Sequence, residues 1–483
     1  MLPHDDAMVE VELIDDEPDA HSSAPAGPRV DRRPLSARYR ISRAGPAGIV
    51  VVLLLAVVGG FLLARPGPPT RGAVRSLDDP VSARWQAEGV VLGVARDLVV
   101  VQSDIFQVRE VTVIDATTGQ ERWNRRLGAS GVATTCLPAV TATPAAVWCT
   151  RQRRVVTDPR TGEAGTQEAA IVGLSLDDGT VLAERVMRIP SAGLVAVADD
   201  VVVADRVGTT LTIRRLDART WHPIWTSAVE LSPRTTDGQI DASVQAEGDL
   251  VVVRGSTVMV LRVSDGAELA RWEPVVEPRV RTLEAAEVEV TSAGFAAWSE
   301  LSGGVRTSAG VWHDLTGVEL TRFDGTWAEP DASDGSASGV LLVGTEPGEV
   351  AAVDVAGGRE LWGAQAAGGA LLRHRNAVVL ADGDLLTSIE AGSGRHRWSV
   401  AVAGLRPGAG AVTDGRSMAV LAFHGARWRL VTIDLRTGQV RWATSVPGIP
   451  AVTEEVNLAG RARISAVGGH LVVQWGRTLT WAG

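Results

Sequence analysis

The chain contains no lysine, so all 47 of its basic residues are arginine. Enzymes that hold a substrate as a Schiff base need a lysine amine, and the composition therefore excludes that chemistry. We attribute the exclusive use of arginine to genomic base composition rather than to function. Valine, alanine, glycine and threonine dominate the long middle of the chain, where helical periodicity is scarce, so the composition favours strands.

The eight histidines lack the spacings of metal sites, since neither a His-x-x-x-His pair nor an HExxH motif occurs. No Gly-x-Ser-x-Gly elbow or phosphate-binding loop is present either. His374 and His396 lie in arginine-rich predicted strands, and we expect both to be solvated rather than catalytic. Asp331 and Asp334 lack the alternating acids and distal glutamate of a calcium loop, so we interpret residues 331–340 as a polar connection.

The charge is low for a chain of this length. The formal net charge is -10, and the nine acids and six arginines of residues 1–64 leave -7 for residues 65–483. A mildly acidic body without a basic stripe argues against nucleic acid as a partner.

One long uncharged run is present, AGIVVVLLLAVVGGFLLA at residues 47–64. It is just long enough to cross a bilayer as a helix. Six arginines lie shortly before it and three shortly after it, so the positive-inside rule predicts a cytoplasmic N-terminus and an external body. A cleaved signal peptide is the alternative, but a polar lead of 46 residues is too long for one. The sequence thus predicts a single-pass protein of the cytoplasmic membrane, with this anchor as its membrane contact.

Residues 1–46 form an acidic and then arginine-rich tail that buries too little apolar surface to fold. We favour a solvated, disordered tail; the alternative is a docking peptide that uses the apolar residues among the acids, which are Val9, Val11, Leu13 and Ile14. Residues 65–80 are rich in proline and glycine and are expected to be a stiff spacer. The body then comprises residues 81–483.

Four units of the body share one ungapped pattern of an acid, a glycine and a tryptophan. They are Asp115, Gly119 and Trp123; Asp354, Gly358 and Trp362; Glu390, Gly394 and Trp398; and Asp434, Gly438 and Trp442. The acid can bond backbone amides and fold a turn, and the glycine supplies positive φ at its corner. The tryptophan can fill the wedge between two neighbouring sheets, with its N–H on a carbonyl.

Other units keep the pattern only in part. One retains Asp217 and Trp225 but has Trp221 where glycine is expected, and weaker copies end near Ala183, Trp272 and Phe323. Each unit contains about four short strands at the spacing of propeller blades. The sequence therefore predicts an all-β β-propeller of four-stranded blades, with eight blades favoured and seven or nine left open.

The two ends of the body complete one another in this scheme. Residues 470–483 supply two strands, and the lone strand ending in Trp85 lies one period, 38 residues, before Trp123. We expect the N-terminal strand to complete the C-terminal blade, because ring closure removes exposed strand edges.

The pattern Asp-x-x-x-Gly-x-x-x-Trp at blade spacing resembles the repeat of quinoprotein-type β-propellers, known as PQQ-like repeats. The resemblance covers residues 81–483. It implies the propeller scaffold, whereas only some members bind pyrroloquinoline quinone (PQQ) and others are non-enzymatic envelope proteins. With its anchor, short tail and arginine bias, the chain resembles an actinobacterial envelope member.

The quinoprotein dehydrogenases of that family have a disulfide between adjacent cysteines, a calcium ion held by acidic and amide side chains, and an aspartate base. The two cysteines here, Cys136 and Cys149, are separated by twelve residues and cannot form that ring. They lie on two predicted strands of one unit, outside the membrane, and we expect a structural disulfide rather than free thiols. The motif tryptophans could stack on a quinone, but packing is the better expectation.

Two functions remain open at this point. The first is a monomeric binding or scaffolding propeller of the cell envelope, which recruits an envelope protein or small ligand through its loops and needs no cofactor. The second is a PQQ-dependent oxidoreductase that uses calcium. The cofactor-binding residues of the second function cannot be assigned from the sequence.

Overall fold

The computed structural model describes residues 71–95, 97–105, 108–129, 136–139, 145–157, 164–188, 193–197, 200–207, 209–230, 243–254, 257–272, 283–291, 293–301, 309–330, 332–446, 449 and 462–482. The chain divides into two units, Met1–Gly67 and Pro68–Gly483, and all described residues belong to the second. The predicted tail (1–46) and anchor (47–64) lie outside the described residues. In the part that is described, no helix has the length and apolar character needed to span a bilayer.

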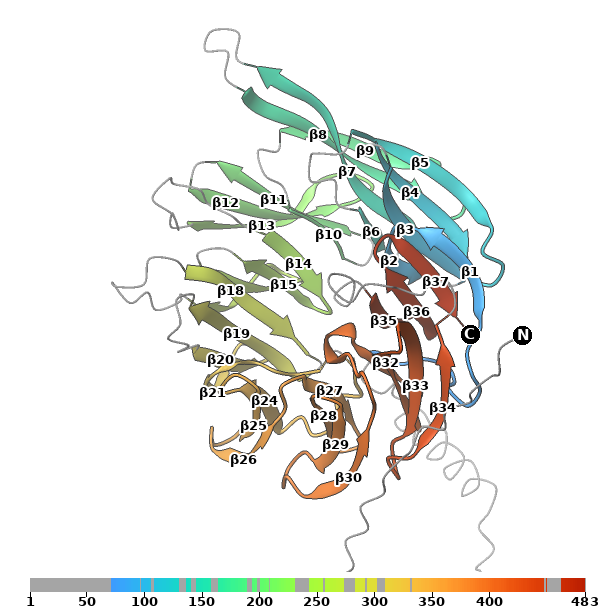
Figure 1. Cartoon of the computed structure of the whole chain (residues 1–483). Coiled ribbons are helices and arrows are strands. Elements are labelled where there is room, and N and C mark those ends of the chain that lie inside the picture. Colours follow the sequence, from blue (N-terminus) through green and yellow to red (C-terminus); the bar gives the residue numbers. More distant parts are fainter. Residues whose placement is uncertain are drawn as a thin grey trace, which may run out of the picture. The chain divides into compact units, whose positions relative to one another are not determined.

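The described strands form nine sheets, antiparallel except for one short edge strand, that are arranged as the blades of a ring (Figure 1). Blades 1 to 3 contain β2 (Val90–Ala95), β3 (Leu98–Ile105), β4 (Val108–Asp115) and β5 (Glu121–Ala129); β6 (Cys136–Ala139), β7 (Ala146–Thr157), β8 (Ala164–Ser175) and β9 (Val181–Arg188); and β10 (Gly193–Val197), β11 (Asp200–Val207), β12 (Thr210–Asp217) and β13 (Pro223–Glu230).

The next three blades follow in chain order. Blades 4 to 6 contain β14 (Ser243–Glu247), β15 (Leu250–Arg254), β16 (Val258–Arg262) and β17 (Glu268–Trp272); β18 (Leu283–Val290), β19 (Gly294–Leu301), β20 (Ala309–Asp314) and β21 (Glu319–Asp324); and β22 (Thr326–Trp327), β24 (Val340–Gly344), β25 (Glu349–Asp354) and β26 (Glu360–Gln365).

The last three blades include the two irregularities of the ring, a short parallel edge strand and a 3-10 turn, η1 (Pro407–Ala409). Blades 7 to 9 contain β27 (Gly369–His374), β28 (Ala377–Asp382), β29 (Leu385–Glu390) and β30 (His396–Ala401), with β23 (Ala332–Ser333) at the edge; β31 (Ala411–Thr413), β32 (Ser417–His424), β33 (Arg427–Asp434) and β34 (Val440–Ser445); and β35 (Ala462–Val467), β36 (His470–Trp475), β37 (Thr478–Ala482) and β1 (Ala83–Glu88).

The ring closes as expected, because β1 pairs with β37 and becomes the outer strand of blade 9. In Figure 1 the blue β1 lies beside the red β37. Trp85 of β1 and Trp481 of β37 are directly opposed, and their rings stack with centroids 5.1 Å apart. A strand from each end of the described chain thus completes one sheet.

The propeller prediction is confirmed, but the favoured number of eight blades is wrong: the structure has nine. Each degenerate unit forms a complete four-stranded blade, and none is an insertion in a neighbour. The reason is that strand pairing depends on apolar inner strands such as β15, whose Leu250–Val253 are all buried, whereas the tryptophan acts between blades. A unit that loses its tryptophan therefore remains a blade.

The two cysteines confirm the predicted disulfide. Cys136 of β6 and Cys149 of β7 are directly opposed in the antiparallel ladder and are bonded to each other. Both are buried in the cluster between blades 1 and 2. The bond therefore cross-links the inner hairpin of blade 2.

The second half of the expected spacer differs from the prediction. Residues Arg71–Asp78, which we call the strap, lie against the propeller instead of standing free. Val74 and Leu77 are 8% and 0% exposed, and Val74 N donates to Thr413 O over 2.8 Å. Apolar side chains at these two positions favour burial over a solvated linker.

Candidate functional site

The acids of the repeat fold the turns between the third and fourth strands of their blades. Asp115 accepts hydrogen bonds on Oδ1 from the backbone amides of Thr117 and Thr118, both 3.0 Å away. The Arg122 side chain, together with the Thr118 amide, lowers the pKa of Asp115 to about 2. Asp434 makes the same turn with the amides of residues 436 and 437, each at 2.9 Å.

The tryptophans of the repeat lie between blades. At six interfaces the indole Nε1 donates to a backbone carbonyl across the interface. The pairs are Trp85 to Ala116, Trp123 to Leu176, Trp225 to Val263, Trp362 to Ala391, Trp398 to Leu435 and Trp442 to Leu77, at 2.7–2.9 Å. Each ring thus fills a wedge and satisfies its one polar group there.

The glycines of the repeat allow that contact. A Cβ on Gly394 or Gly438 would lie 2.7 or 2.8 Å from the ring of the preceding blade's tryptophan, and both residues have φ near +70°. Gly119 stands in the same relation to Trp85. At Gly358 the neighbour is Thr321 instead of a tryptophan. The motif therefore describes an interface between blades, and it brings its own residues together for packing.

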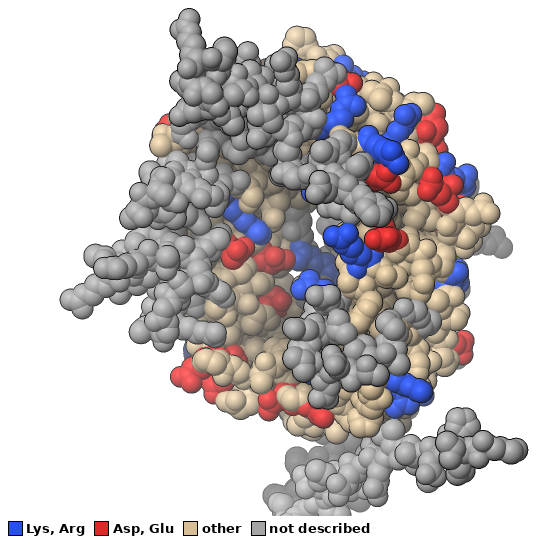
Figure 2. Space-filling model, turned by 45° about the horizontal axis from the view of Figure 1, so that its top comes forward, with Lys and Arg blue, Asp and Glu red and all other residues tan. Residues whose placement is uncertain are grey.

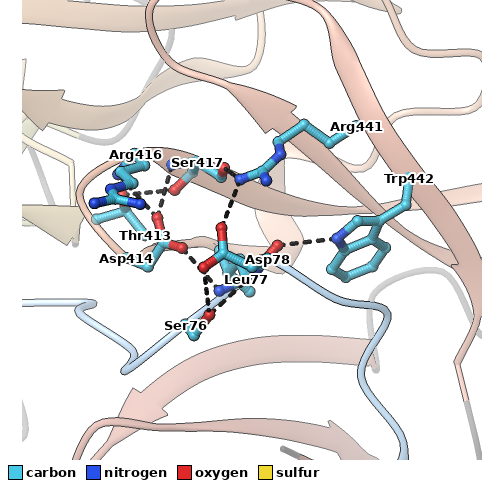
Figure 3. Close-up of polar contacts among 9 residues, drawn as sticks. All are labelled: Ser76, Leu77, Asp78, Thr413, Asp414, Arg416, Ser417, Arg441 and Trp442. Carbon is cyan, nitrogen blue, oxygen red and sulfur yellow. Dashed lines mark hydrogen bonds and ion pairs between the residues drawn. The ribbon is translucent and has the colours of Figure 1, made fainter.

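The strap completes the one blade that has no turn of its own. Trp442 of blade 8 donates a hydrogen bond to Leu77 O over 2.9 Å. The other tryptophans donate instead to a residue in the turn between the third and fourth strands of the next blade. Leu77 N donates to Asp414 Oδ2 over 2.8 Å, and Asp78 pairs with Arg441 at 3.0 Å (Figure 3). The strap thus replaces the missing turn of blade 9.

The N-terminal end of the strap reaches other blades. Arg71 N donates to Ser333 O over 2.9 Å, and the Arg71 guanidinium lies 2.6 Å from the carboxylate of Glu289 in blade 5. Arg75 N donates to Gly469 O of blade 9 over 2.8 Å. The strap therefore crosses the ring from blade 5 to blade 9. Figure 2 shows the opening at the centre of the ring, with basic and acidic side chains close together around it.

A cavity of about 490 Å³, which we call the strap pocket, lies where Arg71 meets blades 4 to 7. Its walls include Trp312 and Trp327, and Leu315 lies at its rim with 45% of its surface exposed. The Trp327 ring stacks on those of Trp298 and Trp312, with centroids 5.8 and 5.6 Å apart. The three rings pack together, although Trp327 lies in a segment of polar residues between two units.

The strap pocket also contains a buried ion pair. Arg373, which is 5% exposed, bonds the carboxylate of Glu329 and donates to Val340 O over 3.0 Å. Burial raises the pKa of Glu329, against the lowering effects of Arg373 and of the Leu342 amide. The sequence gives no sign of this pair, since its partners lie 44 residues apart in unrelated segments.

His374 and His396, the two histidines predicted to be solvated, differ in their exposure. His374 was expected to be solvated, which is wrong: its side chain is only 13% exposed, with Nδ1 3.0 Å from Asp334 Oδ2. Its Nε2 lies 3.0 Å from Gly415 O, so the imidazole joins blades 7 and 8. His396 is exposed and contacts Ser399 Oγ at 2.8 Å. Asp331 lies outside the described residues, and Asp334 folds its own turn by accepting from Ser336 N.

The residues that the structure describes do not form a site that fits a bound quinone with its metal. Over the described ranges, no group of three or more His, Cys, Asp or Glu is placed to hold a metal ion. Cys136 and Cys149 lie on facing strands, so their bond is not the adjacent-cysteine ring, and neither lines the strap pocket. We therefore derive no catalytic step through a quinone.

Comparison with known proteins agrees with this architecture. Residues 305–482 match the family model described as outer membrane protein assembly factor BamB. The matched residues extend from blade 5 to blade 9. They include three of the four ungapped motifs. No curated protein matches the sequence.

Among solved structures, BamB from Moraxella catarrhalis is 16% identical, with a TM-score of 0.37 over 69% of this chain and 98% of that one. The quinohemoprotein alcohol dehydrogenase from Comamonas testosteroni is 12% identical, with a TM-score of 0.44 over 91% of this chain and 84% of that one. A europium-containing methanol dehydrogenase is 12% identical, with a TM-score of 0.40 over 86% and 90%. These values are too low to support an argument about function.

Proposed function

We propose that this chain is a binding or scaffolding propeller of the cell envelope. Residues 47–64 anchor it in the cytoplasmic membrane, with residues 1–46 inside and the propeller outside. The disulfide supports the external placement, because such bonds persist in oxidising compartments. The match of residues 305–482 to the assembly factor family supports a protein as the partner.

The observation that carries this proposal is the chemistry of the strap pocket. Two of its three carboxylates, those of Glu289 and Glu329, are already engaged by Arg71 and Arg373, and the third, that of Asp249, is exposed to solvent. What the pocket offers to a partner is therefore a tryptophan wall and the exposed Leu315. Aromatic and arginine side chains in a pocket are typical of the energetic centres of protein interfaces. Such a surface recognises a partner without a free acid–base pair.

The test places a photo-crosslinking amino acid at Leu315 of the full-length protein in cells. The matched control carries it at Val181 on blade 2, which is 54% exposed and does not line the strap pocket. We expect one discrete cross-linked species from position 315 that is absent from position 181. Identical cross-linking patterns at the two positions would contradict the proposal.

Membrane orientation has its own test. Protease added to intact, wall-stripped cells should digest the propeller and spare residues 1–46. Protection of the propeller would contradict the proposed topology and would leave the binding surface to be assigned to another compartment.

The alternative function, a quinone-dependent oxidoreductase, predicts a different result. Full-length protein is mixed with excess PQQ and calcium, and dye reduction is followed with alcohols and sugars. We expect no rate above the protein-free blank, because the described residues assemble no metal-ligand group. A rate that chelator abolishes would replace the binding function with the enzymatic one.

A further inference from the structure

A second cavity, of about 500 Å³, lies between blades 7 and 8 and has a rim of arginines. We call it the arginine pocket. Five arginines line it: Arg375 from the β27–β28 turn, Arg397 from β30, Arg416 from the β31–β32 turn, Arg436 from the β33–β34 turn and Arg441 from β34. Only two carboxylates, those of Asp78 and Asp434, line it with them. Five separate segments thus bring an excess of positive charge to one cavity.

Both carboxylates are already occupied. Asp78 pairs with Arg441 at 3.0 Å, and Arg441 also donates to Ser417 Oγ over 2.8 Å (Figure 3). Asp434 accepts three hydrogen bonds within its own turn, from the amide of Arg436 and from the amide and hydroxyl of Thr437. The pKa of Asp78 is lowered chiefly by Arg441 and to a lesser degree by Arg416, and that of Asp434, against the effect of burial, by the Thr437 amide and to a lesser degree by Arg436. Two carboxylates nevertheless leave the five arginines of the pocket in excess.

Three of the five guanidinium groups are held by no hydrogen bond or ion pair from a residue that the structure describes. Arg375, Arg416 and Arg436 make no side-chain hydrogen bond or ion pair with another described residue. Arg397 makes one long contact, 3.4 Å to Asn376 O, and lies near enough to Glu390 to lower the pKa of that carboxyl, after the larger effect of Ser393. Like charges gathered around a cavity repel one another, so an anion that enters it gains from all of them.

The backbone at the rim also favours a role for arginine. Arg375 and Asn376 form the two-residue turn between β27 and β28, with φ of 47° and 61°. A turn with two positive φ values favours asparagine and glycine, and an arginine at the first of these positions is strained. Strain of this kind concentrates at functional sites. Glycine would fit this backbone better but would remove a guanidinium from the pocket.

We infer that the arginine pocket binds a phosphate-bearing anion. Guanidinium groups present paired N–H donors that match the oxygens of phosphate, and they stay charged at every relevant pH. The small residues Ala377, Ser388 and Gly415 line the cavity between the arginines and leave room for such a group. The ligand is either a soluble phosphate ester or the headgroup of an anionic lipid, which share this chemistry.

The first arm of the test titrates full-length protein with sodium pyrophosphate in a calorimeter. The variant Arg416→Ser/Arg436→Ser removes two unpartnered guanidinium groups that are exposed, so the fold should tolerate it. The control is Arg427→Ser, also exposed, at the opposite end of β33 from Asp434 and about 23 Å away at the rise of a strand. We expect at least a tenfold loss of affinity in the double variant, no change in the control, and a shallower salt dependence in the double variant.

A second variant, Arg375→Gly, separates binding from stability. Because glycine relieves the strained turn, this variant should unfold at the same temperature as wild type or higher, yet bind pyrophosphate more weakly. The second arm floats the protein with vesicles of phosphatidylglycerol or phosphatidylcholine. A loss of the phosphatidylglycerol preference in the double variant identifies a lipid headgroup, and an unchanged preference identifies a soluble phosphate. The inference is overturned if pyrophosphate and vesicles both fail to distinguish the double variant from wild type.

Discussion

The interface between blades 7 and 8 and the interface between blades 2 and 3 each contain a tryptophan, but from opposite sides. Trp398 reaches forward from β30 to Gly438 and Leu435 O of blade 8. In blade 2 the corresponding position is Ala183, and the tryptophan instead comes back from the turn of blade 3, where Trp221 replaces the glycine. The exchange is reciprocal, since each interface has one large and one small residue.

The backbone shows how the second arrangement is accommodated. Trp221 has φ of 60°, the conformation for which the motif otherwise uses glycine. Its ring packs edge-on against Trp148, with centroids 5.8 Å apart, and its carbonyl accepts from Arg185 over 2.6 Å. These two interfaces show that the aromatic ring that fills a wedge can be supplied by either of the two neighbouring blades.

The largest effect on stability is expected at the interface between blades 7 and 8, where the tryptophan of one blade contacts the glycine and the carbonyl of the next. Trp398→Ala should lower the free energy of unfolding by about 3–5 kcal/mol, the range for a large buried aromatic, because Trp398 is 6% exposed and its Nε1 is bonded. Denaturant titration of the full-length protein measures it. A loss as small as that of an exposed substitution such as Arg427→Ser would break the account of the wedge.

The next effect concerns blade 2, where the forward tryptophan is missing and the inner hairpin is cross-linked. Cys136→Ala/Cys149→Ala should cost about 3 kcal/mol, because the disulfide limits the entropy of the unfolded chain. Thiol labelling of unreduced, denatured wild type should find neither cysteine free. Two labelled cysteines would contradict the bond.

A smaller effect tests the reciprocal exchange itself. Trp221→Gly should cost about 1–2 kcal/mol, because the lost packing of a half-buried ring is partly offset by glycine at positive φ. Adding Ala183→Trp should restore most of the lost stability, because it gives the interface between blades 2 and 3 the arrangement found between blades 7 and 8. If the double variant is less stable than Trp221→Gly alone, the two interfaces are not equivalent.

The smallest effect concerns the turns. The hydrogen bond from Arg122 lowers the pKa of Asp115 to about 2, so its stabilising effect is present above the ordinary carboxyl pKa and is lost as pH falls toward 2. Asp115→Asn should therefore make the unfolding midpoint less sensitive to acid between pH 4 and about 2. Acid titration followed by tryptophan fluorescence measures this, and parallel curves for variant and wild type would refute it.

The fold could be predicted because its signal is local. Asp434, Gly438 and Trp442 act within one turn and the strand after it, and Trp85 shows ring closure by its spacing alone. The blade count could not be settled from the sequence, because the weaker copies have residues such as Ala183 and Thr321 at the tryptophan position. Strand pairing shows that each of these weaker copies is a complete blade.

The candidate sites were less predictable, because their contacts join distant segments. Leu77 meets Trp442 across 365 residues, and Arg71 meets Glu289 across 218. Trp327 follows Gly325 and Thr326 in the sequence, whereas its partners Trp298 and Trp312 lie on other strands. No period in the sequence relates such positions.

The pairing of β1 with β37 also sets the order of events during synthesis. Gln86 bonds Thr480 across 394 residues, so the ribosome must make nearly the whole propeller before the first strand has its partner. At about 5–20 residues per second, β1 waits on the order of 20–80 s, with its edge and Trp85 uncovered. For most of that interval Trp442 has not been made, so Leu77 O of the strap lacks its hydrogen-bond donor. Nascent chains of this protein therefore present an open edge strand to chaperones and to one another until the ring is joined.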